Sequence, residues 1–487
     1  MAAQRLRTGA DFLSDLRNKP RTVYVDGERV TNVAEHRAFR GGARSIARLF
    51  DFAAAPENRE TMTFVPPDSP AEAGPVWRCW QIPRTHAELR AKRIAAEKWA
   101  ELSFGLMGRT PDHVANFFAG YAAKPGFFGK YGDNLAKFYR HARDTHAYLS
   151  YAIVPPQIDR SKPAHKQSDP TLYAGVVKEN DAGIFLSGGQ QLATAGVYSD
   201  YVQVSCIHPL QPGDENYAIN VAIPADDPGL RLYARRPFAL GATNSFDYPL
   251  STRFDEADCF VVLDNCFVPW ERVFVYRDLE RVREQWWKTP SHVYGNHQAQ
   301  ARYATKLRFL MGLAKRMNEA TGNDAAPPVM VQMGELAAYA SIVEYMLHSH
   351  ETVGTIDEEG VLWPSRSALY AVMALQSQIN PHMIDIVREL TGAAMITLPS
   401  SRQDLDHPEP ARDVERYFQS AGMGARERVA LMRLAWDFLG TEFGSRHQQY
   451  EKFYGGASFV VKMNAFRHYD FKRALALVNE ALKLNDE

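Results

Sequence analysis

Residues 247–278 read DYPLSTRFDEADCFVVLDNCFVPWERVFVYRD, and in this stretch a β-rich region gives way to helices. Two runs rich in β-branched and aromatic residues, 259–269 and 272–276, predict strands, because such side chains suit a pleated, half-buried surface. They close a series of short strand-like runs that begins near residue 170, with Gly, Asn, Asp and Pro between the runs. This spacing favours a compact β-barrel or β-sandwich.

Helical patterns lie on both sides of the β-rich region. Residues 86–108 carry apolar side chains at helical spacing and end in a glycine. Residues 296–320 form one long amphipathic pattern, which we expect to stop at Gly322 because glycine readily adopts the left-handed conformation of a helix end. Further helical segments follow towards residue 456.

The character of the chain changes near Pro155 and again after Asp278. We therefore expect an α+β fold with three parts: an N-terminal, mostly helical domain (1–152), a central β-domain (153–277) and a C-terminal helical bundle with a tail (278–487). Such an arrangement can bury a large ligand between the β-domain and the bundle, although a fold alone does not name the chemistry.

The composition argues against several classes of protein. The 56 basic and 57 acidic side chains leave a net charge of −1, so we expect no nucleic-acid partner. No stretch approaches about 18 uninterrupted apolar residues, and we expect no membrane span. Only four cysteines occur, none in a C-x-x-C pair, and the N-terminal residues lack the apolar core of a signal peptide, so we expect a cytoplasmic protein.

The stretch LMGRTPDHV, residues 106–114, combines a helix start with an unexplained cation. Thr110 is a good N-cap, Pro111 suits the first helical position, and Asp112 favours the positive end of the helix dipole. Arg109 does not fit this pattern, because a cation at a helix N-terminus is unfavourable unless an anion lies nearby. Arg109 is either part of an anion or phenolate site or one half of a surface salt bridge.

Several other side chains could bind a ligand, and each also has a plain structural explanation. Tyr151 could be a core aromatic, and His297, near the start of the long helix, could be a structural residue whose hydrogen bonds are satisfied. The other candidates could lie in a solvated hairpin, a surface loop or a solvated helix face. They are Gln190, Gln191 and Thr194 in a strand-like segment, Gln157 and Arg160 at the domain junction, and Arg446, His447, Gln449 and Tyr450 near a helix end.

Common catalytic motifs do not occur. The chain has no G-x-S-x-G, no Walker loop and no H-E-x-x-H, and Gly188-Gly189 does not form a Rossmann fingerprint. His348 and His350 are two residues apart on a predicted helix and point to opposite sides, so we expect no metal site.

Five stretches in order along the chain resemble a known family: RTVYVDGERV, LMGRTPDHV, VPPQIDR, the block at 247–278, and ERVALMRLAWDFLGTEFGSRHQQYEKFYGG. Together they are similar to the 4-hydroxyphenylacetate 3-monooxygenase family, the large oxygenase components of two-component, reduced-flavin-dependent aromatic hydroxylases. The resemblance covers nearly the whole chain. It implies an acyl-CoA dehydrogenase-like fold with a C-terminal four-helix bundle that forms a homotetramer.

The resemblance also implies a reaction. A separate reductase uses NAD(P)H to make reduced FAD, which diffuses to the oxygenase. Dioxygen then adds to the flavin to give a hydroperoxide, whose distal oxygen passes to an electron-rich aromatic carbon. The protein must exclude water and make the substrate more nucleophilic, and deprotonation of a phenol beside a cation such as Arg109 does this.

The family's motifs place its substrate and FAD contacts on particular residues of this chain. Arg109 is retained, but His113 stands where the family motif has tyrosine, and Tyr151 stands where it has histidine. This exchange implies a phenol or an electron-rich heteroaromatic substrate other than 4-hydroxyphenylacetate. His297 matches the position of a catalytic base in chlorophenol and nitrophenol oxygenases. The implied FAD contacts are Gln157, Arg160, Gln191, Thr194, Ser445 and Arg446.

Two other functions remain open at this stage. A related FAD-dependent hydroxyacyl-CoA dehydratase would need an iron–sulfur cluster, and no cysteine lies between Cys79 and Cys206 to supply a close pair. A non-catalytic assembly homologue would be expected to lose Arg109 or the GSRH segment, and both are present.

Overall fold

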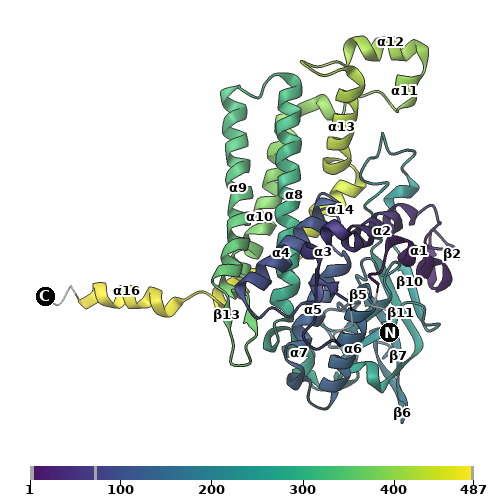
Figure 1. Ribbon diagram of the computed structural model, residues 1–487, viewed down its shortest axis with the longest axis vertical. Coiled ribbons are helices and arrows are strands. Elements are labelled where there is room, and N and C mark those ends of the chain that lie inside the picture. The colour runs from purple at the N-terminus through teal and green to yellow at the C-terminus, as the bar shows by residue number, and fades with distance from the viewer. Residues whose placement is uncertain (1–4, 71–73, 484–487) are drawn as a thin grey trace.

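The computed structural model describes residues 5–70 and 74–483, and it places the helices and sheets in the predicted order (Figure 1). A set of helices comes first, two β-sheets follow, and long helices make up the C-terminal region, so the predicted α+β fold class is confirmed. No helix in the described part of the chain is long and apolar enough to cross a membrane. The N-terminal helices are α1 (Gly9–Asn18), α2 (Arg40–Ala54), α3 (Arg59–Met62), α4 (His86–Glu101), α5 (Pro111–Ala122) and α6 (Gly132–Asp144).

The larger sheet has six strands in the order β2-β1-β10-β11-β7-β6. All neighbours are antiparallel except β1 and β10, which run parallel. The run at 259–269 forms β11 as predicted, at the centre of this sheet. The strands are β1 (Thr22–Val25), β2 (Glu28–Val30), β6 (Gly175–Asn180), β7 (Gly183–Gln191), β10 (Leu230–Ala234) and β11 (Cys259–Pro269).

The smaller sheet has the order β12-β9-β8-β5, with β5 parallel to β8. Its strands are β5 (Leu149–Ala152), β8 (Tyr201–Ser205), β9 (Ile219–Pro224) and β12 (Val273–Tyr276). Two short hairpins pair β3 (Thr63–Phe64) with β4 (Val76–Trp77) and β13 (Thr355–Ile356) with β14 (Leu362–Trp363). Strands β1 and β2 belong to the larger sheet and β5 belongs to the smaller one, although all three precede residue 153. The division of the chain into three domains stays a prediction.

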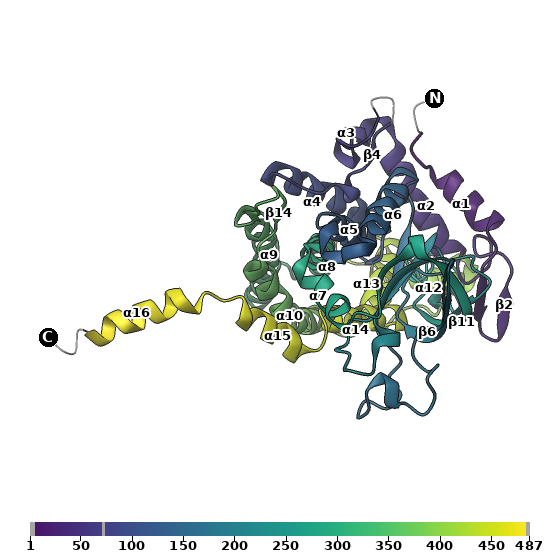
Figure 2. The ribbon, with the colours of Figure 1, turned by 90° about the horizontal axis from the view of Figure 1, so that it is seen from below.

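The C-terminal region is helical. The long helices α8, α9 and α10 lie side by side, and α16 projects away from the body in both views (Figures 1 and 2). Helix α8 begins earlier than the predicted residue 296 but ends as expected, at Gly322 with a φ of 72°. The helices are α7 (Leu279–Lys288), α8 (Ser291–Thr321), α9 (Pro327–Thr352), α10 (Arg366–Thr391), α11 (Gln403–Asp406), α12 (Pro408–Tyr417), α13 (Ala425–Leu439), α14 (Glu442–Phe453), α15 (Ser458–Arg467) and α16 (Phe471–Lys483).

Helices α5 and α8 pack against each other so closely that two glycines are required between them. A Cβ atom at Gly120 would lie 2.2 Å from the Cα of Ser291. A Cβ atom at Gly295 would lie 2.1 Å from the ring of Phe117. These contacts lie in the second half of α5 and hold the helix, which carries His113 in its first turn, against α8.

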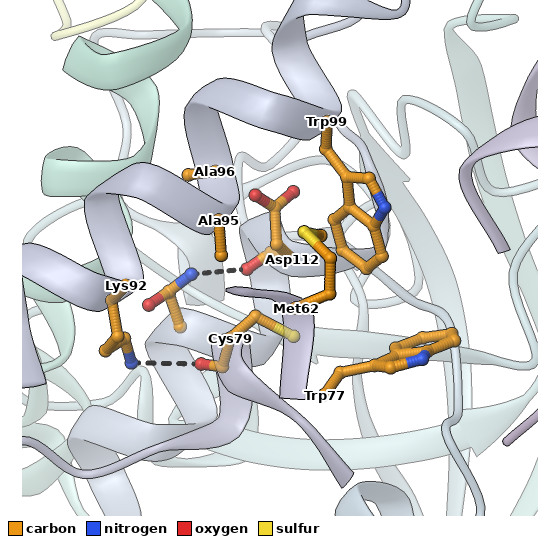
Figure 3. Close-up of a pocket in the computed structure, with 9 residues that line it drawn as sticks. Met62, Trp77, Cys79, Lys92, Ala95, Ala96, Trp99 and Asp112 are labelled. Atoms are coloured by element: carbon orange, nitrogen blue, oxygen red, sulfur yellow. Dashed lines mark hydrogen bonds between the residues drawn. The ribbon is translucent and has the colours of Figure 1, made fainter. Parts of the chain in front are cut away.

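A small enclosed cavity of about 10 Å³ lies beside the first turn of α5 (Figure 3). Its lining brings together two buried ionisable groups, Lys92 and Asp112. The Lys92 ammonium donates to the backbone carbonyl of Cys79 at 2.9 Å, and burial lowers the pKa of Lys92 to about 7. The cavity has room for about one water molecule. The lining residues are Met62, Trp77, Cys79, Lys92, Ala95, Ala96, Trp99, Asp112 and Asn116.

The depressed pKa of Lys92 predicts a stability that rises with pH. The unfolded chain holds the Lys92 proton up to the usual lysine pKa of 10.5, whereas the folded protein releases it near pH 7. Between these values the unfolded state binds more protons, so folding becomes more favourable as the pH rises, by about 2–3 kcal/mol from pH 7 to pH 9. We expect Lys92→Met to remove this rise, measured as the change in apparent melting temperature across that range. Lys98→Met, at an exposed lysine of α4, should leave the rise unchanged. Equal slopes for Lys92→Met and wild type would contradict the assignment.

Candidate active site

Arg109 lies just before α5 and donates to two phenols from distant parts of the chain. One guanidinium nitrogen lies 2.5 Å from the Tyr450 hydroxyl on α14, and the other lies 3.2 Å from the Tyr151 hydroxyl on β5. The same guanidinium carbon lies 5.2–5.3 Å from the ring centres of Tyr151, Tyr450 and Tyr454. Arg109 is therefore enclosed by aromatic side chains, and within the described residues its guanidinium is not part of a surface salt bridge.

The electrostatics of Arg109 favour a permanent positive charge. Burial alone would lower the pKa of Arg109, but the surrounding phenol oxygens and Glu256 outweigh burial and raise it above its usual value. Glu256 also accepts the backbone N–H of Arg109, so the polypeptide at this point is anchored to the β-domain. A fixed cation with phenolic neighbours can stabilise an oxygen that gains negative charge.

His113, one turn into α5, lies beside this cation and is fully buried. Its Nδ1 atom lies 2.9 Å from Oε1 of Gln298 on α8. The ring packs against Phe117, Tyr151 and Tyr454 at centroid distances of 5.3, 5.6 and 6.2 Å. Burial, reinforced by the nearby Arg109 charge, holds the pKa of His113 well below its usual value, so the imidazole is neutral.

The start of α5 differs from the simple capped helix that the sequence suggests. Thr110 occupies the N-cap position and Pro111 begins the helix, as predicted, but the Thr110 hydroxyl does not cap the helix. It donates instead to Asp112 Oδ1 at 2.5 Å, and the Gln298 amide donates to both groups. Burial raises the pKa of Asp112 to about 6 despite these hydrogen bonds. The polar residues of this turn thus form a buried network that the interpretation as a helix cap does not explain.

A second polar network links α14 to the β-domain. Arg446 donates to both oxygens of Asp258 at 2.6 and 3.0 Å and to Glu256 at 3.1 Å. Asp258 also accepts from the Thr194 hydroxyl at 2.7 Å. Because Glu256 holds the backbone of Arg109 as well, this network connects the candidate cofactor residues Thr194 and Arg446 to the cluster around Arg109.

The loop after β5 and the end of β7 present hydrogen-bonding and apolar groups together. Gln191 donates from its side chain to the carbonyl of Pro155 at 3.1 Å, and the exposed side chains of Gln157 and Arg160 lie 3.4 Å apart. Leu192 is 55% exposed and has a φ of 66°, a conformation that non-glycine residues rarely adopt. The exposed apolar side chains at this edge are Ile158, Leu192 and Ile207. Such a mixture fits a flavin ring and its polar chain.

Two sequence candidates lie outside these networks. Ser445 is exposed on α14, and its backbone N–H makes the helical hydrogen bond to the carbonyl of Thr441. His297 is buried on α8, and its Nε2 atom lies 2.9 Å from Glu351 on α9. Arg93 Nε lies 2.7 Å from the same carboxylate oxygen, so the contacts of His297 belong to a buried ion pair between α4 and α9.

The structure also reveals site residues that the sequence did not identify. Tyr454 and Gln298 were missed, and Tyr450 was a candidate only as one of several polar side chains near a helix end, whereas it accepts from Arg109. The four-residue spacing of Tyr450 and Tyr454 places both on one face of a helix, which is a signal that could have been found. Gln298 carried no such signal, because its partners lie about 185 residues away.

Known proteins resemble this chain along most of its length. The oxygenase component of 4-hydroxyphenylacetate 3-monooxygenase from Pseudomonas aeruginosa is 35% identical over 474 residues, which cover 96% of this chain and 90% of that protein. The oxygenase component of 4-nitrophenol 2-monooxygenase from a Rhodococcus species is 33% identical, with coverages of 96% and 89%. A crystal structure of HpaB with FAD and 4-hydroxyphenylacetate superimposes with a TM-score of 0.92 at 32% identity and covers 98% of this chain and 99% of that one. Fold and site thus define the oxygenase component of a two-component, flavin-dependent aromatic hydroxylase.

Two family models account for almost the entire chain. The N-terminal model of 4-hydroxyphenylacetate 3-hydroxylase matches residues 8–275, and the C-terminal model matches residues 282–483. The chain belongs to the 4-hydroxyphenylacetate 3-hydroxylase family, as its motifs predicted. This membership decides among the three functions that the sequence left open in favour of the FADH2-dependent aromatic monooxygenase.

Proposed function

We propose that this oxygenase hydroxylates a phenol other than 4-hydroxyphenylacetate, and that Arg109, His113 and Tyr151 bind the phenol's hydroxyl group. The observation that carries the proposal is that Tyr151 contacts both other groups: its hydroxyl accepts from Arg109 at 3.2 Å, and its ring centre lies 5.6 Å from that of His113. The family motifs have these two residue types in exchanged positions. An imidazole and a phenol are therefore both available, but each comes from the chain position that holds the other group in the family motifs.

The proposed roles follow from the charges and hydrogen-bonding groups. The Arg109 guanidinium binds the substrate oxygen and lowers the pKa of the phenol, by about 1–3 units for a close pair. His113, which is neutral, accepts the hydroxyl proton, and Tyr151 orients the hydroxyl group by a hydrogen bond. His113 suits the acceptor role better than His297, because the hydrogen-bond partner of His297 is Glu351. The aromatic cluster around Arg109 excludes water from the reacting oxygen.

The cofactor is proposed to lie along the edge of the β-domain and the first turns of α14. Gln157, Arg160, Gln191, Thr194, Ser445 and Arg446 would hold it, with the exposed apolar side chains of Ile158 and Leu192 against its ring. When bound, reduced FAD reacts with dioxygen and supplies the oxygen atom that enters the aromatic ring. A separate flavin reductase that uses NAD(P)H would provide the reduced cofactor.

Assembly and location complete the proposal. Helices α15 and α16 expose a series of large apolar side chains, and α16 extends away from the body (Figures 1 and 2), which supports a homotetramer in which these helices pack on other copies. All four cysteines are buried free thiols, in agreement with a cytoplasmic enzyme. The exposed apolar residues of the two helices are Phe459, Val460, Met463, Phe466, Phe471, Leu475, Leu477, Val478 and Leu482.

An exchange of the two substrate-binding residues tests the proposed specificity. We expect the wild-type enzyme, supplied with reduced FAD, to hydroxylate other phenols such as 4-nitrophenol with a higher kcat/KM than 4-hydroxyphenylacetate. The double variant His113→Tyr with Tyr151→His should shift the ratio of the two kcat/KM values towards 4-hydroxyphenylacetate by about tenfold, the effect of one well-placed hydrogen bond to a charged group. The two single variants serve as controls. A wild-type enzyme that prefers 4-hydroxyphenylacetate would contradict the proposal.

A further inference from the structure

Gln298 connects His113 to the buried carboxylate of Asp112. The side chain of Gln298 is 2% exposed and is enclosed between α8 and the first turn of α5. Its amide nitrogen lies 3.1 Å from Asp112 Oδ1 and 3.2 Å from Thr110 Oγ1, while its amide oxygen lies 2.9 Å from His113 Nδ1. Both ends of the amide are therefore engaged by groups of the same helix start.

The orientation of the amide follows from what its partners can donate. The Thr110 hydroxyl gives its hydrogen to Asp112, so its oxygen is left to accept from Gln298. The carboxylate oxygen of Asp112 also accepts. A reversed amide would place the Gln298 oxygen against two acceptors and leave the buried carboxylate with fewer donors, and each buried polar group without a partner destabilises the fold. The NH2 group of Gln298 must face Asp112 and Thr110, and its oxygen must face His113.

This orientation determines which nitrogen of His113 carries hydrogen. The oxygen of Gln298 can only accept, so Nδ1 of His113 must donate. Because the imidazole is neutral, its other nitrogen, Nε2, then holds a lone pair. Nε2 is buried and makes no hydrogen bond to the residues that the structure describes. It belongs to the ring that packs against Tyr151, whose hydroxyl accepts from Arg109.

We propose that Gln298 is a positioning residue that holds His113 in the Nδ1–H tautomer, so that Nε2 is the acceptor for the hydroxyl group of the aromatic substrate. This inference rests on the proposed function, because it assumes that a phenol binds beside Arg109 and His113. In the transfer the substrate O–H bond breaks, its electron pair stays on the oxygen beside Arg109, and the proton forms the new Nε2–H bond. The negative oxygen that results lies beside both Arg109 and the imidazolium, and it offsets the Arg109 charge that holds the pKa of His113 low in the free site. No other reactant is needed, and the site selects ring hydroxyl groups over ethers, which lack the proton.

A bound chromogenic phenol measures this role without turnover. The full-length protein with reduced FAD and without oxygen is titrated with 4-nitrophenol between about pH 5 and pH 9, and the absorbance of the bound nitrophenolate is followed. In the wild type we expect the bound probe to ionise at a lower pH than the free probe. In Gln298→Met, His113 loses the acceptor that fixes its tautomer, so the ionisation midpoint should rise and kcat/KM should fall by about tenfold or more.

Two further variants separate positioning from simple packing. Gln300→Met changes the same residue type two positions along α8, where the buried amide donates to Gln376 and is not in contact with His113, and it should leave the ionisation midpoint unchanged. Gln298→Glu combined with Asp112→Asn exchanges the amide and the carboxylate, keeps an acceptor at Nδ1, and should restore the wild-type midpoint.

The outcomes distinguish this inference from the proposed function. If Gln298→Met matches Gln300→Met in ionisation midpoint and in kcat/KM, Gln298 only joins two helices and the inference is overturned. If the double exchange with Asp112 fails to restore the midpoint although the variant is folded, the tautomer does not explain the effect of Gln298. If the wild type itself neither binds 4-nitrophenol nor hydroxylates a phenol, the proposed function is wrong, and the inference, which assumes a bound phenol, is wrong with it.

Discussion

Replacing Arg109 with alanine is expected to lower kcat/KM for phenol hydroxylation by about 100- to 1,000-fold, the usual effect of losing one donor to a developing oxyanion. The Arg109 guanidinium donates to Tyr151 and Tyr450. The other cations beside Tyr450, Arg302 and Arg446, are held by carboxylates, so we expect neither to replace Arg109 at the substrate oxygen. The affinity for reduced FAD should change only a few-fold, because Asp258 holds Arg446 and Thr194, and Glu256 binds Arg109 through its backbone N–H, which alanine retains. Steady-state kinetics with a flavin titration measures both quantities.

The matched control for Arg109 is a conservative change and not a surface one. Arg109→Lys keeps the charge but lacks the planar fork of the guanidinium that reaches two phenols in fixed directions, and it should recover only part of the activity. If Arg109→Ala instead greatly weakens the binding of reduced FAD but hydroxylates normally when the flavin is saturating, Arg109 is a cofactor residue and its proposed role is wrong.

Replacing Glu451 with alanine is expected to be the most destabilising change in the helical region. Glu451 is fully buried on α14 and pairs with Arg302 and Lys306 of α8, and these cations outweigh burial and lower the pKa of Glu451 to about 2. Removing the carboxylate leaves two buried cations without their partner, at a cost of about 3–5 kcal/mol. The measurement is the apparent melting temperature at a fixed scan rate, which should fall by several degrees.

The melting temperatures of two other variants are compared with that of Glu451→Ala. Glu427→Ala removes an exposed partner of Arg316 and should change the melting temperature little, since surface pairs contribute about 0–1 kcal/mol. Glu451→Gln keeps the side-chain volume and one acceptor oxygen, so it should lie between the alanine variant and the wild type. A melting temperature for Glu451→Ala equal to that of Glu427→Ala would show that the buried pair does not hold α14 on α8.

Much of the fold was predictable because its signals are local. Strand β11 has the bounds expected from its run of β-branched residues, and α8 ends at Gly322 because that position requires a left-handed residue. The turn between β1 and β2 has positive φ angles of 52° at Asp26 and 77° at Gly27, and an Asp-Gly pair favours such angles. The start of α8 was missed by five residues, because Ser291 follows Pro290 without a strong capping signal in the sequence.

The candidate site was predictable only in part, because most of its contacts join distant segments. The sequence singled out Arg109 because a cation is unfavourable at a helix start. In the structure the phenols of Tyr151 and Tyr450 surround Arg109 and accept its hydrogen bonds, which explains this position. On α8 the sequence drew attention to His297, yet the neighbouring Gln298 is the residue that faces α5. Two adjacent helical residues point about 100° apart, and only the packing of α8 decides which of them faces the site.

Oxygen transfer from dioxygen to a phenol ring is the central claim, and isotope labelling tests it most directly. The wild-type protein is mixed with reduced FAD, 4-nitrophenol and isotope-labelled dioxygen, and the product is analysed by mass spectrometry. The expected product carries one additional hydroxyl group whose oxygen is labelled, in an amount that falls sharply for Arg109→Ala. A hydroxylated product without the label, or reduced FAD consumed with no hydroxylated phenol, would contradict the assignment.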